Sequence, residues 1–247
     1  MPKKLLISFL MLFTFTMSAQ YGRMYEEFGI MAGPIFFQGD FGERGEVANT
    51  YKNAGVSGGL FYYLSLENDR SSFKDNFKVR GEVTFMSVDL QHYGPSTYSD
   101  TNFGRKLRGM RGNIKMGNVG TQLEYYPFKT DDYSHATFSP YVSGGVQLSS
   151  YSTKAYSFLG NIGVPQTVPN KYVDGFKNTT GIVFSATAGV GFRYKLADYH
   201  AIVFDARVQY FFDDWVDGMN PYREVYTENK NNDYAVIFHI GYAFYIN

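Results

Sequence analysis

Large apolar side chains alternate with small or polar ones in eight separate segments of the chain. Side chains of a β-strand point to opposite sides at every second residue, so this period predicts strands with one apolar face. The expected strands are residues 26–37, 53–64, 77–88, about 113–126, 138–150, 181–196, 201–212 and 233–247. Each is at least as long as the roughly 9 to 11 residues that a tilted strand needs to cross a bilayer.

The links between these strands alternate in length. The expected outer loops are 38–52, 89–112, 151–180 and 213–232, and the shorter inner turns are 65–76, 127–137 and 197–200. This asymmetry is typical of bacterial outer-membrane barrels, and an even strand number returns both termini to the inner side. The pattern therefore predicts an all-β fold, an eight-stranded antiparallel up-and-down transmembrane β-barrel. The alternative is a soluble β-sandwich or lipocalin-like barrel, whose apolar face would point inward.

The first twenty residues have the pattern of a secretory signal peptide. Lys3 and Lys4 precede an apolar run from Leu5 to Phe15, and the small residues Ser18 and Ala19 follow. This run is too short for a membrane-spanning helix. We expect a signal peptide at residues 1–20, cleaved on export, and an outer-membrane barrel domain at 21–247.

Composition agrees with this class. Aromatic residues make up 19% of the chain and 26 residues are glycine, which suits closely packed strands with aromatic girdles. Cysteine is absent, so disulfides and cysteine zinc sites are excluded. Removing Lys3 and Lys4 with the signal leaves 21 basic against 23 acidic residues, which argues against nucleic acid as a partner.

The non-lipid face of the expected strands carries charge of both signs. An eight-stranded barrel is only wide enough for side chains to fill it, so buried charges there must be paired. We expect a structural ion-pair network, and a gated proton or ion path is the alternative. Its expected members are Glu27, Arg80, Glu82, Glu124, Arg193, Lys195, Asp205, Arg207 and His239.

Motifs in the links give weaker signals. "GDFG" (Gly39 to Gly42) is expected to be a turn at the end of the first strand. "RKLRGMRG" (Arg105 to Gly112) predicts either a solvated loop or a contact with lipopolysaccharide phosphates or an acidic partner. "DDWVDG" (Asp213 to Gly218) holds three carboxylates and the single Trp, in a spacing that matches no metal loop.

The four histidines do not form a catalytic pattern. His92 is at a strand end, His135 and His200 are in expected inner turns, and only His239 faces the interior of a strand. No Ser-His-carboxylate arrangement can be assembled from these positions. The sequence therefore predicts no catalytic residue, no metal site and no cofactor.

Two resemblances indicate a cellular role. In "HIGYAFYI", His239, Gly241, Phe244 and Ile246 resemble the C-terminal signal that outer-membrane barrels present to the barrel-assembly machinery. The whole chain resembles small Bacteroidetes barrels related to PorG of the type IX secretion system. The resemblance rests on "SAQ" at the end of the signal, "GPIFFQGDFG" (Gly33 to Gly42), "RGMRGN" (Arg108 to Asn113) and "LEYYPF" (Leu123 to Phe128). It implies a component that anchors or organises a secretion or envelope assembly without catalysis.

The expected function is accordingly a non-enzymatic anchoring or accessory role in an envelope assembly, in contact with outer-membrane lipid, lipopolysaccharide and protein partners. The alternatives are a structural barrel like OmpA or OmpX, a narrow channel, and a barrel enzyme acting on lipid or peptide. Long, charged inner turns are the candidate contacts with periplasmic partners. Their candidate residues are Glu67, Asp69, Arg70, Lys74, Asp75, Lys129, Asp131 and Asp132.

Overall fold

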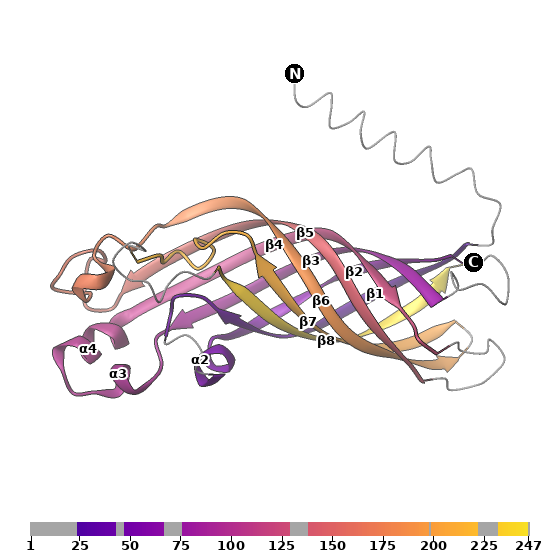
Figure 1. Cartoon of the computed structure of the whole chain (residues 1–247), viewed down its shortest axis with the longest axis horizontal. Coiled ribbons are helices and arrows are strands. Elements are labelled where there is room, and N and C mark those ends of the chain that lie inside the picture. Colours follow the sequence, from indigo (N-terminus) through magenta and orange to yellow (C-terminus); the bar gives the residue numbers. More distant parts are fainter. Residues whose placement is uncertain are drawn as a thin grey trace, which may run out of the picture.

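The computed structural model describes residues 24–42, 47–66, 76–128, 138–197, 199–221 and 232–246. Its eight antiparallel strands form one closed barrel, in which each strand pairs with the next and β8 pairs with β1 (Figure 1). The predicted eight-stranded up-and-down barrel is confirmed. The strands are β1 (Met24–Gln38), β2 (Ala54–Leu66), β3 (Phe77–Gln91), β4 (Met110–Tyr125), β5 (Phe138–Ser157), β6 (Thr179–Ala197), β7 (His200–Phe211) and β8 (Tyr234–Ile246).

The outward face of the barrel is apolar. Val56, Phe85 and Ile182 expose 69%, 67% and 71% of their surface, while the intervening residues of their strands are largely buried. A continuous exposed apolar belt that runs around the barrel is stable against lipid and costly in water. The arrangement is the opposite of the lipocalin-like alternative, in which the apolar faces would fill the interior.

Several strands continue further at the outer end than predicted. β3 runs to Gln91, β4 begins at Met110 and β5 ends at Ser157. The prediction that residues 89–112 and 151–180 are entirely loop is therefore wrong. The alternation continues there, but the apolar residues now lie on the inward face. Val88, Leu90, Met110 and Ile114 point inward and are buried.

Short helices gather at the outer end of the barrel, opposite the end where the C-terminus lies (Figure 1). They are α2 (Val47–Lys52), α3 (Pro95–Tyr98), α4 (Asn102–Gly109) and the 3-10 helix η3 (Asn170–Tyr172). Thr101 caps α4 by accepting a hydrogen bond from the Gly104 amide at 3.1 Å. Among the described residues, no helix is long and apolar enough to cross a membrane.

The basic motif at Arg105 to Gly112 is ordered structure instead of a solvated loop. It forms most of α4 and the start of β4. Arg108 donates hydrogen bonds to the Thr97 and Ser99 carbonyls at 2.6 and 2.9 Å, and Arg111 donates to the carbonyls of Arg108 and Met110. Two of its positive charges therefore hold the α3–α4 segment onto the barrel.

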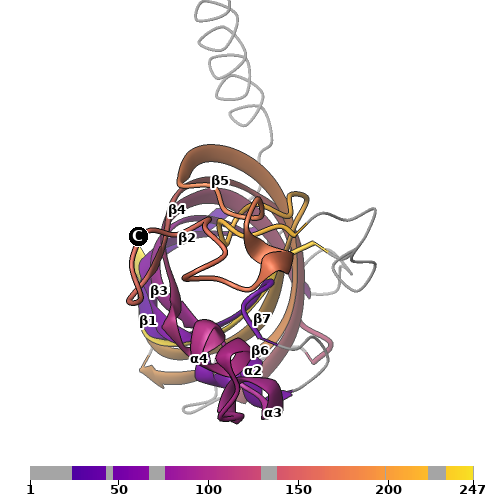
Figure 2. The ribbon, with the colours of Figure 1, turned by 90° about the vertical axis from the view of Figure 1, so that its left-hand side faces the viewer.

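The outer half of the barrel interior is filled by apolar side chains, which we call the outer apolar cluster. The loops that follow β5 and β7 contribute Val168, Val216 and Met219, which are all fully buried, and Figure 2 shows the first of these loops across the barrel mouth. Main members from the strands are Ile35, Phe37, Val88, Leu90, Met110, Ile114, Phe211 and Ile237, and Phe41 follows β1. These loops close the outer end of the interior.

Candidate functional site

The charged side chains of the inner half meet around Arg80 of β3. One terminal nitrogen, Nη1, lies 2.8 Å from Glu124 Oε1 of β4 and 2.8 Å from Asp205 Oδ2 of β7. The Arg80 Nε lies 3.2 Å from Glu82 Oε2. All four side chains have 0 to 4% of their residue surface exposed, so these contacts are shielded from water. One guanidinium thus links strands that are distant in the sequence.

A second group lies on the outer side of Arg80. Arg207 Nη1 lies 2.8 Å from both carboxylate oxygens of Glu82. Gln122 donates a hydrogen bond to Glu82 Oε1 at 3.0 Å, and Gln147 donates to the same oxygen. Glu82 therefore receives enough donors to remain charged inside the barrel.

A third group lies toward the inner end. Lys78 and Arg193 both form ion pairs with Glu27, and the Arg193 guanidinium lies 4.0 Å from the centre of the Tyr63 ring. Tyr126 donates to Glu124 at 2.5 Å, and Tyr141 donates to Asp205 at 2.8 Å. We call the three groups together the ion-pair network. Its four carboxylates (Glu27, Glu82, Glu124, Asp205) face four cations (Lys78, Arg80, Arg193, Arg207).

The structure brings together seven of the nine residues that the sequence assigned to the network, and it adds others. Lys195 stays partly exposed near the inner end of β6, and His239 contacts Ser57 instead of a network carboxylate. Lys78 was missed, although it precedes Arg80 by two residues on the same face. Gln122, Gln147, Tyr126 and Tyr141 were also missed, because neutral polar residues occur on the interior face of any barrel.

Neutral polar side chains separate the ion-pair network from the outer apolar cluster. Asn118 donates to Thr84 at 3.1 Å and accepts from Ser149 at 2.6 Å, while Gln209 donates to Ser185 at 2.8 Å. The interior thus passes from charges through amides and hydroxyls to apolar side chains. A water-filled pore would expose its lining, yet Arg80, Glu124 and Gln209 each expose 0%.

Four buried carboxylates form a separate acidic cluster at the outer end: Asp40, Asp214, Asp217 and Asp233. Asp217 Oδ2 accepts from the Asp40 amide at 2.6 Å, and Asp233 Oδ2 accepts from the Asp217 amide at 3.2 Å. Burial, and then the charges of Asp217, Asp40 and Asp214, raise the pKa of Asp233 well above its usual value. Through these bonds "GDFG" and "DDWVDG", far apart in the sequence, join the loops to each other. Within the described part of the chain, no His, Asp and Glu residues form a group able to hold a metal.

The histidines described by the structure make packing and hydrogen-bond contacts. His92 Nδ1 accepts from the Gly42 amide at 2.8 Å, and burial with nearby Lys171 and Arg111 lowers its pKa to about 3, so the ring is neutral. His239 Nε2 lies 3.0 Å from Ser57 Oγ inside the barrel, but its Nδ1 has no hydrogen-bond partner among the described residues. This Ser-His pair lacks the carboxylate that orients a catalytic base.

His200 contacts the Tyr242 hydroxyl at 2.5 Å on the outward face. The remaining histidine, His135, lies outside the described residues. So do residues 67–75 and 129–137, which hold all eight candidate partner-binding side chains, and residues 1–23 with the expected signal peptide.

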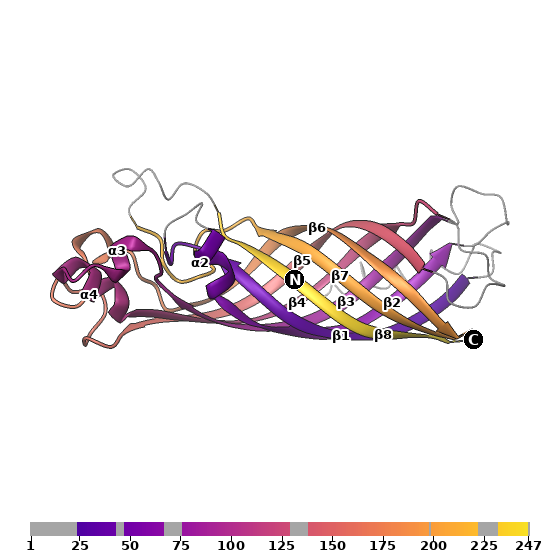
Figure 3. The same ribbon diagram turned by 90° about the horizontal axis from the view of Figure 1, so that it is seen from below.

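The residues of the C-terminal motif lie at the seam where β8 closes on β1, as Figure 3 shows. Phe244 pairs with Phe28, and their ring centres are 5.6 Å apart. Ile246 pairs with Glu26. Gly241 pairs with Met31, and a side-chain carbon added to it would lie 2.1 Å from the Ile30 carbonyl oxygen. The seam therefore needs glycine at this position, independently of any signal that the motif carries.

Comparison with known proteins gives a family and a fold. The family model "Domain of unknown function (DUF6089)" matches residues 3–244, so the chain belongs to this family. A major outer membrane protein from Thermus thermophilus is similar in structure, with 15% identity over 91% of this chain and 100% of that chain and a TM-score of 0.51. No curated protein matches the sequence.

Two other solved barrels resemble the chain more loosely. Ail, the attachment invasion locus protein of Yersinia pestis, has 12% identity and a TM-score of 0.43, over 90% of this chain and 99% of that chain. Neisserial surface protein A has 11% identity and a TM-score of 0.47, over 90% and 96%. The fold of this chain, a closed eight-stranded antiparallel barrel, is that of the Thermus thermophilus outer membrane protein.

Proposed function

We propose that this member of the DUF6089 family resides in an outer membrane after removal of its signal peptide and acts without catalysis, as an anchoring or accessory component of an envelope assembly. Support for the location comes from the apolar outward face of every strand, with side chains such as Ile30, Val119 and Ile240 exposed. Such a belt is the surface that a bilayer requires of a barrel.

The filled interior is the observation that carries the proposed role. Charge pairs in the inner half and apolar side chains in the outer half leave the described interior without exposed polar lining, and the loops cover its outer end. These features weigh against a narrow channel. The incomplete and buried Ser57 and His239 pair weighs against a barrel enzyme. The surfaces left for function are the two ends and the outer wall.

More specifically, we propose that the protein has a role in type IX protein secretion. The sequence motifs at Gly33 to Gly42, Arg108 to Asn113 and Leu123 to Phe128 support it through their resemblance to PorG-related barrels. The inner turns at 67–75 and 129–137 are charged and longer than a tight hairpin needs, so they are the proposed contacts with periplasmic machinery.

A second candidate is a structural barrel of the OmpX type, which contributes to the membrane by its presence alone. The ion-pair network favours it, because the buried charges of the interior are paired within the barrel and require no partner. The two candidates differ in one consequence. An anchoring component retains specific proteins through its turns, whereas a structural barrel retains none.

Affinity purification in mild detergent from the native cell, with quantitative mass spectrometry, separates them. We expect the tagged full-length protein to retain a defined set of envelope proteins, and expect a variant with residues 67–75 and 129–137 replaced by tight turns to insert normally and lose that set. Phe103→Ala, which changes an exposed outer side chain, is the matched control and should retain it. Equal recovery with the turn variant would refute the turn contacts, and no enrichment over an unrelated barrel would favour the structural role.

A further inference from the structure

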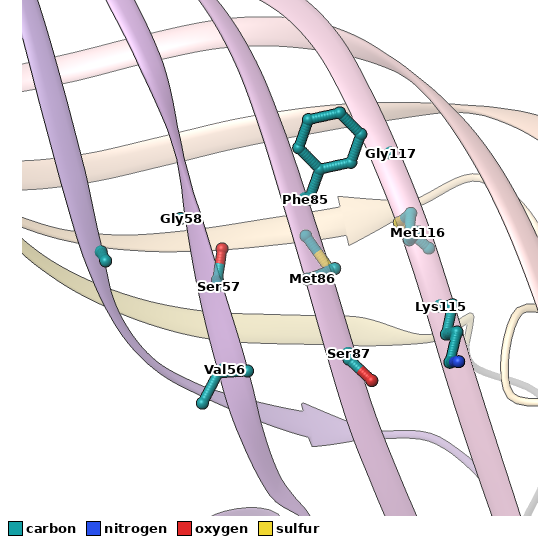
Figure 4. Close-up of a pocket in the computed structure, with 10 residues that line it drawn as sticks. Val56, Ser57, Gly58, Phe85, Met86, Ser87, Lys115, Met116 and Gly117 are labelled. Carbon is teal, nitrogen blue, oxygen red and sulfur yellow. The ribbon is translucent and has the colours of Figure 1, made fainter.

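A groove of about 660 Å³ crosses the outer wall of the barrel over β1 to β4 (Figure 4). We call it the wall groove. Its floor includes the small residues Ala32, Gly58 and Gly117, one from each of three strands, and Val56 and Phe85 stand beside them. In the strand register Ala32 pairs with Gly58, Gly58 with Phe85, and Phe85 with Gly117. The groove therefore follows one row of residues across the wall.

The wall groove lies where the apolar belt ends. The row below it, Val83, Val119, Leu148 and Phe184, is entirely apolar, and its own row continues as Phe85, Gly117, Ser150 and Ile182. The next row outward is polar on β3 to β6, where it consists of Ser87, Lys115, Ser152 and Thr180, and it continues on β2 with the apolar Val56. On β3 to β6 this change from apolar to polar residues between successive rows marks the border between acyl chains and headgroups. This border is on the side of the long loops, which is the outer leaflet of an outer membrane.

Two lysines stand on the headgroup side of this border. Lys115 lines the wall groove and points outward, as Figure 4 shows, and it forms no hydrogen bond or ion pair within the described part of the chain. Lys154 pairs with Asn113 one row further out and is likewise exposed without such a partner there. The nearby carboxylate of Asp89 accepts from Asn113 at 2.7 Å. The rim of the groove thus carries two lysines against one carboxylate, a net positive charge, and neither lysine is ion-paired within the described part of the chain.

We propose that the wall groove binds an acyl chain of a phosphorylated glycolipid of the lipid A type, and that the Lys115 ammonium contacts a phosphate of the same molecule. The proposal rests on the proposed location in an outer membrane. An apolar groove that ends at a lysine on the headgroup border fits an amphiphile with an acyl chain directly attached to an anionic head. Lys154, one row further out, supplies a second cation, which suits a headgroup with two phosphates better than a phospholipid with one.

Native mass spectrometry of the full-length protein, extracted from its own outer membrane, tests this assignment. The probes are lipid A with two phosphates and the same lipid A after enzymatic dephosphorylation. We expect the phosphorylated probe to bind more tightly, and expect Lys115→Gln to weaken it about five-fold while leaving the dephosphorylated probe unaffected. Ala32→Leu and Ser87→Leu, which fill the groove with outward side chains, should weaken both probes. Lys177→Gln removes an exposed outer charge that lies over the Trp215 ring and should change neither.

Equal binding of the two probes to the unmodified protein, or wild-type affinity in Lys115→Gln, would overturn the phosphate contact. Undiminished binding in both leucine variants would overturn the groove. If those variants do not fold, as judged by heat-dependent gel migration, the comparison of Lys115→Gln with Lys177→Gln still decides. A protein that is recovered from the outer membrane but binds both probes equally refutes the phosphate contact and leaves the proposed location standing, whereas absence from the outer-membrane fraction refutes the proposed location.

Discussion

Arg80 is the residue whose removal best tests how the barrel interior is held together. Its guanidinium contacts Glu124 and Asp205 at 2.8 Å and Glu82 at 3.2 Å, and none of these side chains exposes more than a few per cent of its surface. Replacement of Arg80 by Met keeps much of the side-chain volume but removes the charge. The network then holds four carboxylates against three cations, so one negative charge is left uncompensated inside the barrel.

The size of the stability loss depends on the hydrogen-bond donors that Glu124 and Asp205 keep. Breaking a buried ion pair by removing one partner costs about 3 to 5 kcal/mol. Glu124 keeps the Tyr126 hydroxyl, and Asp205 keeps the Tyr141 hydroxyl. We therefore expect Arg80→Met to lower the free energy of unfolding by about 3 kcal/mol, at the lower end of that range.

Urea unfolding in lipid vesicles, followed by the fluorescence of Trp215, measures this difference. Lys154→Gln removes an exposed charge and should change stability by less than about 0.5 kcal/mol. The double variant Arg80→Met with Asp205→Asn restores neutrality, so it should be more stable than Arg80→Met alone. If Arg80→Met costs no more than Lys154→Gln, or if Asp205→Asn adds to the damage, the ion pairs do not stabilise the barrel as argued.

Three other perturbations test separate parts of the structure. The pKa of Asp233 is raised, so this carboxyl contributes stability at pH below its usual pKa of 3.8, and that contribution is lost as the pH rises through the raised pKa. Asp233→Asn should abolish this pH-dependent loss of thermal stability, and an unchanged pH profile of the variant would refute the assignment. Gly241→Ala should reduce the folded fraction on heat-modifiability gels, because its new carbon would lie 2.1 Å from the Ile30 carbonyl oxygen; normal folding would show that the seam can widen. Thr101→Ala removes the α4 cap and should speed hydrogen exchange in that helix by about five-fold, with β4 unaffected as the control.

The barrel was predictable because one signal repeats along the chain. In β7, Ile202, Phe204 and Val208 alternate with Asp205 and Arg207, and the structure places the two sets on opposite faces. At the outer ends of β3 to β5 the same period continues with the apolar residues facing inward, as Ile114 and Lys115 illustrate. The outward apolar face ends where the apolar residues begin to point inward, so the outer parts of these strands were predicted as loops.

The interior site was predictable in its composition but not in its pairings. Period two identifies Arg80 and Asp205 as interior residues, yet their contact depends on the curvature that brings β3 opposite β7. The acidic cluster was not predictable for the same reason. Asp40 and Asp217 are 177 positions apart, and they meet because the loops fold over one barrel mouth.

The central claim is that the interior of this barrel is filled, so that the protein works through its ends and its outer wall. Current recording across planar bilayers, with the reconstituted protein shown to be folded by heat-dependent gel migration, tests it most directly. We predict a silent bilayer for the unmodified protein, and also for Glu82→Gln, because the outer apolar cluster closes the path above the charges. Discrete conductance steps in the unmodified protein that change when Glu82 is neutralised would contradict the claim and assign the barrel to a channel.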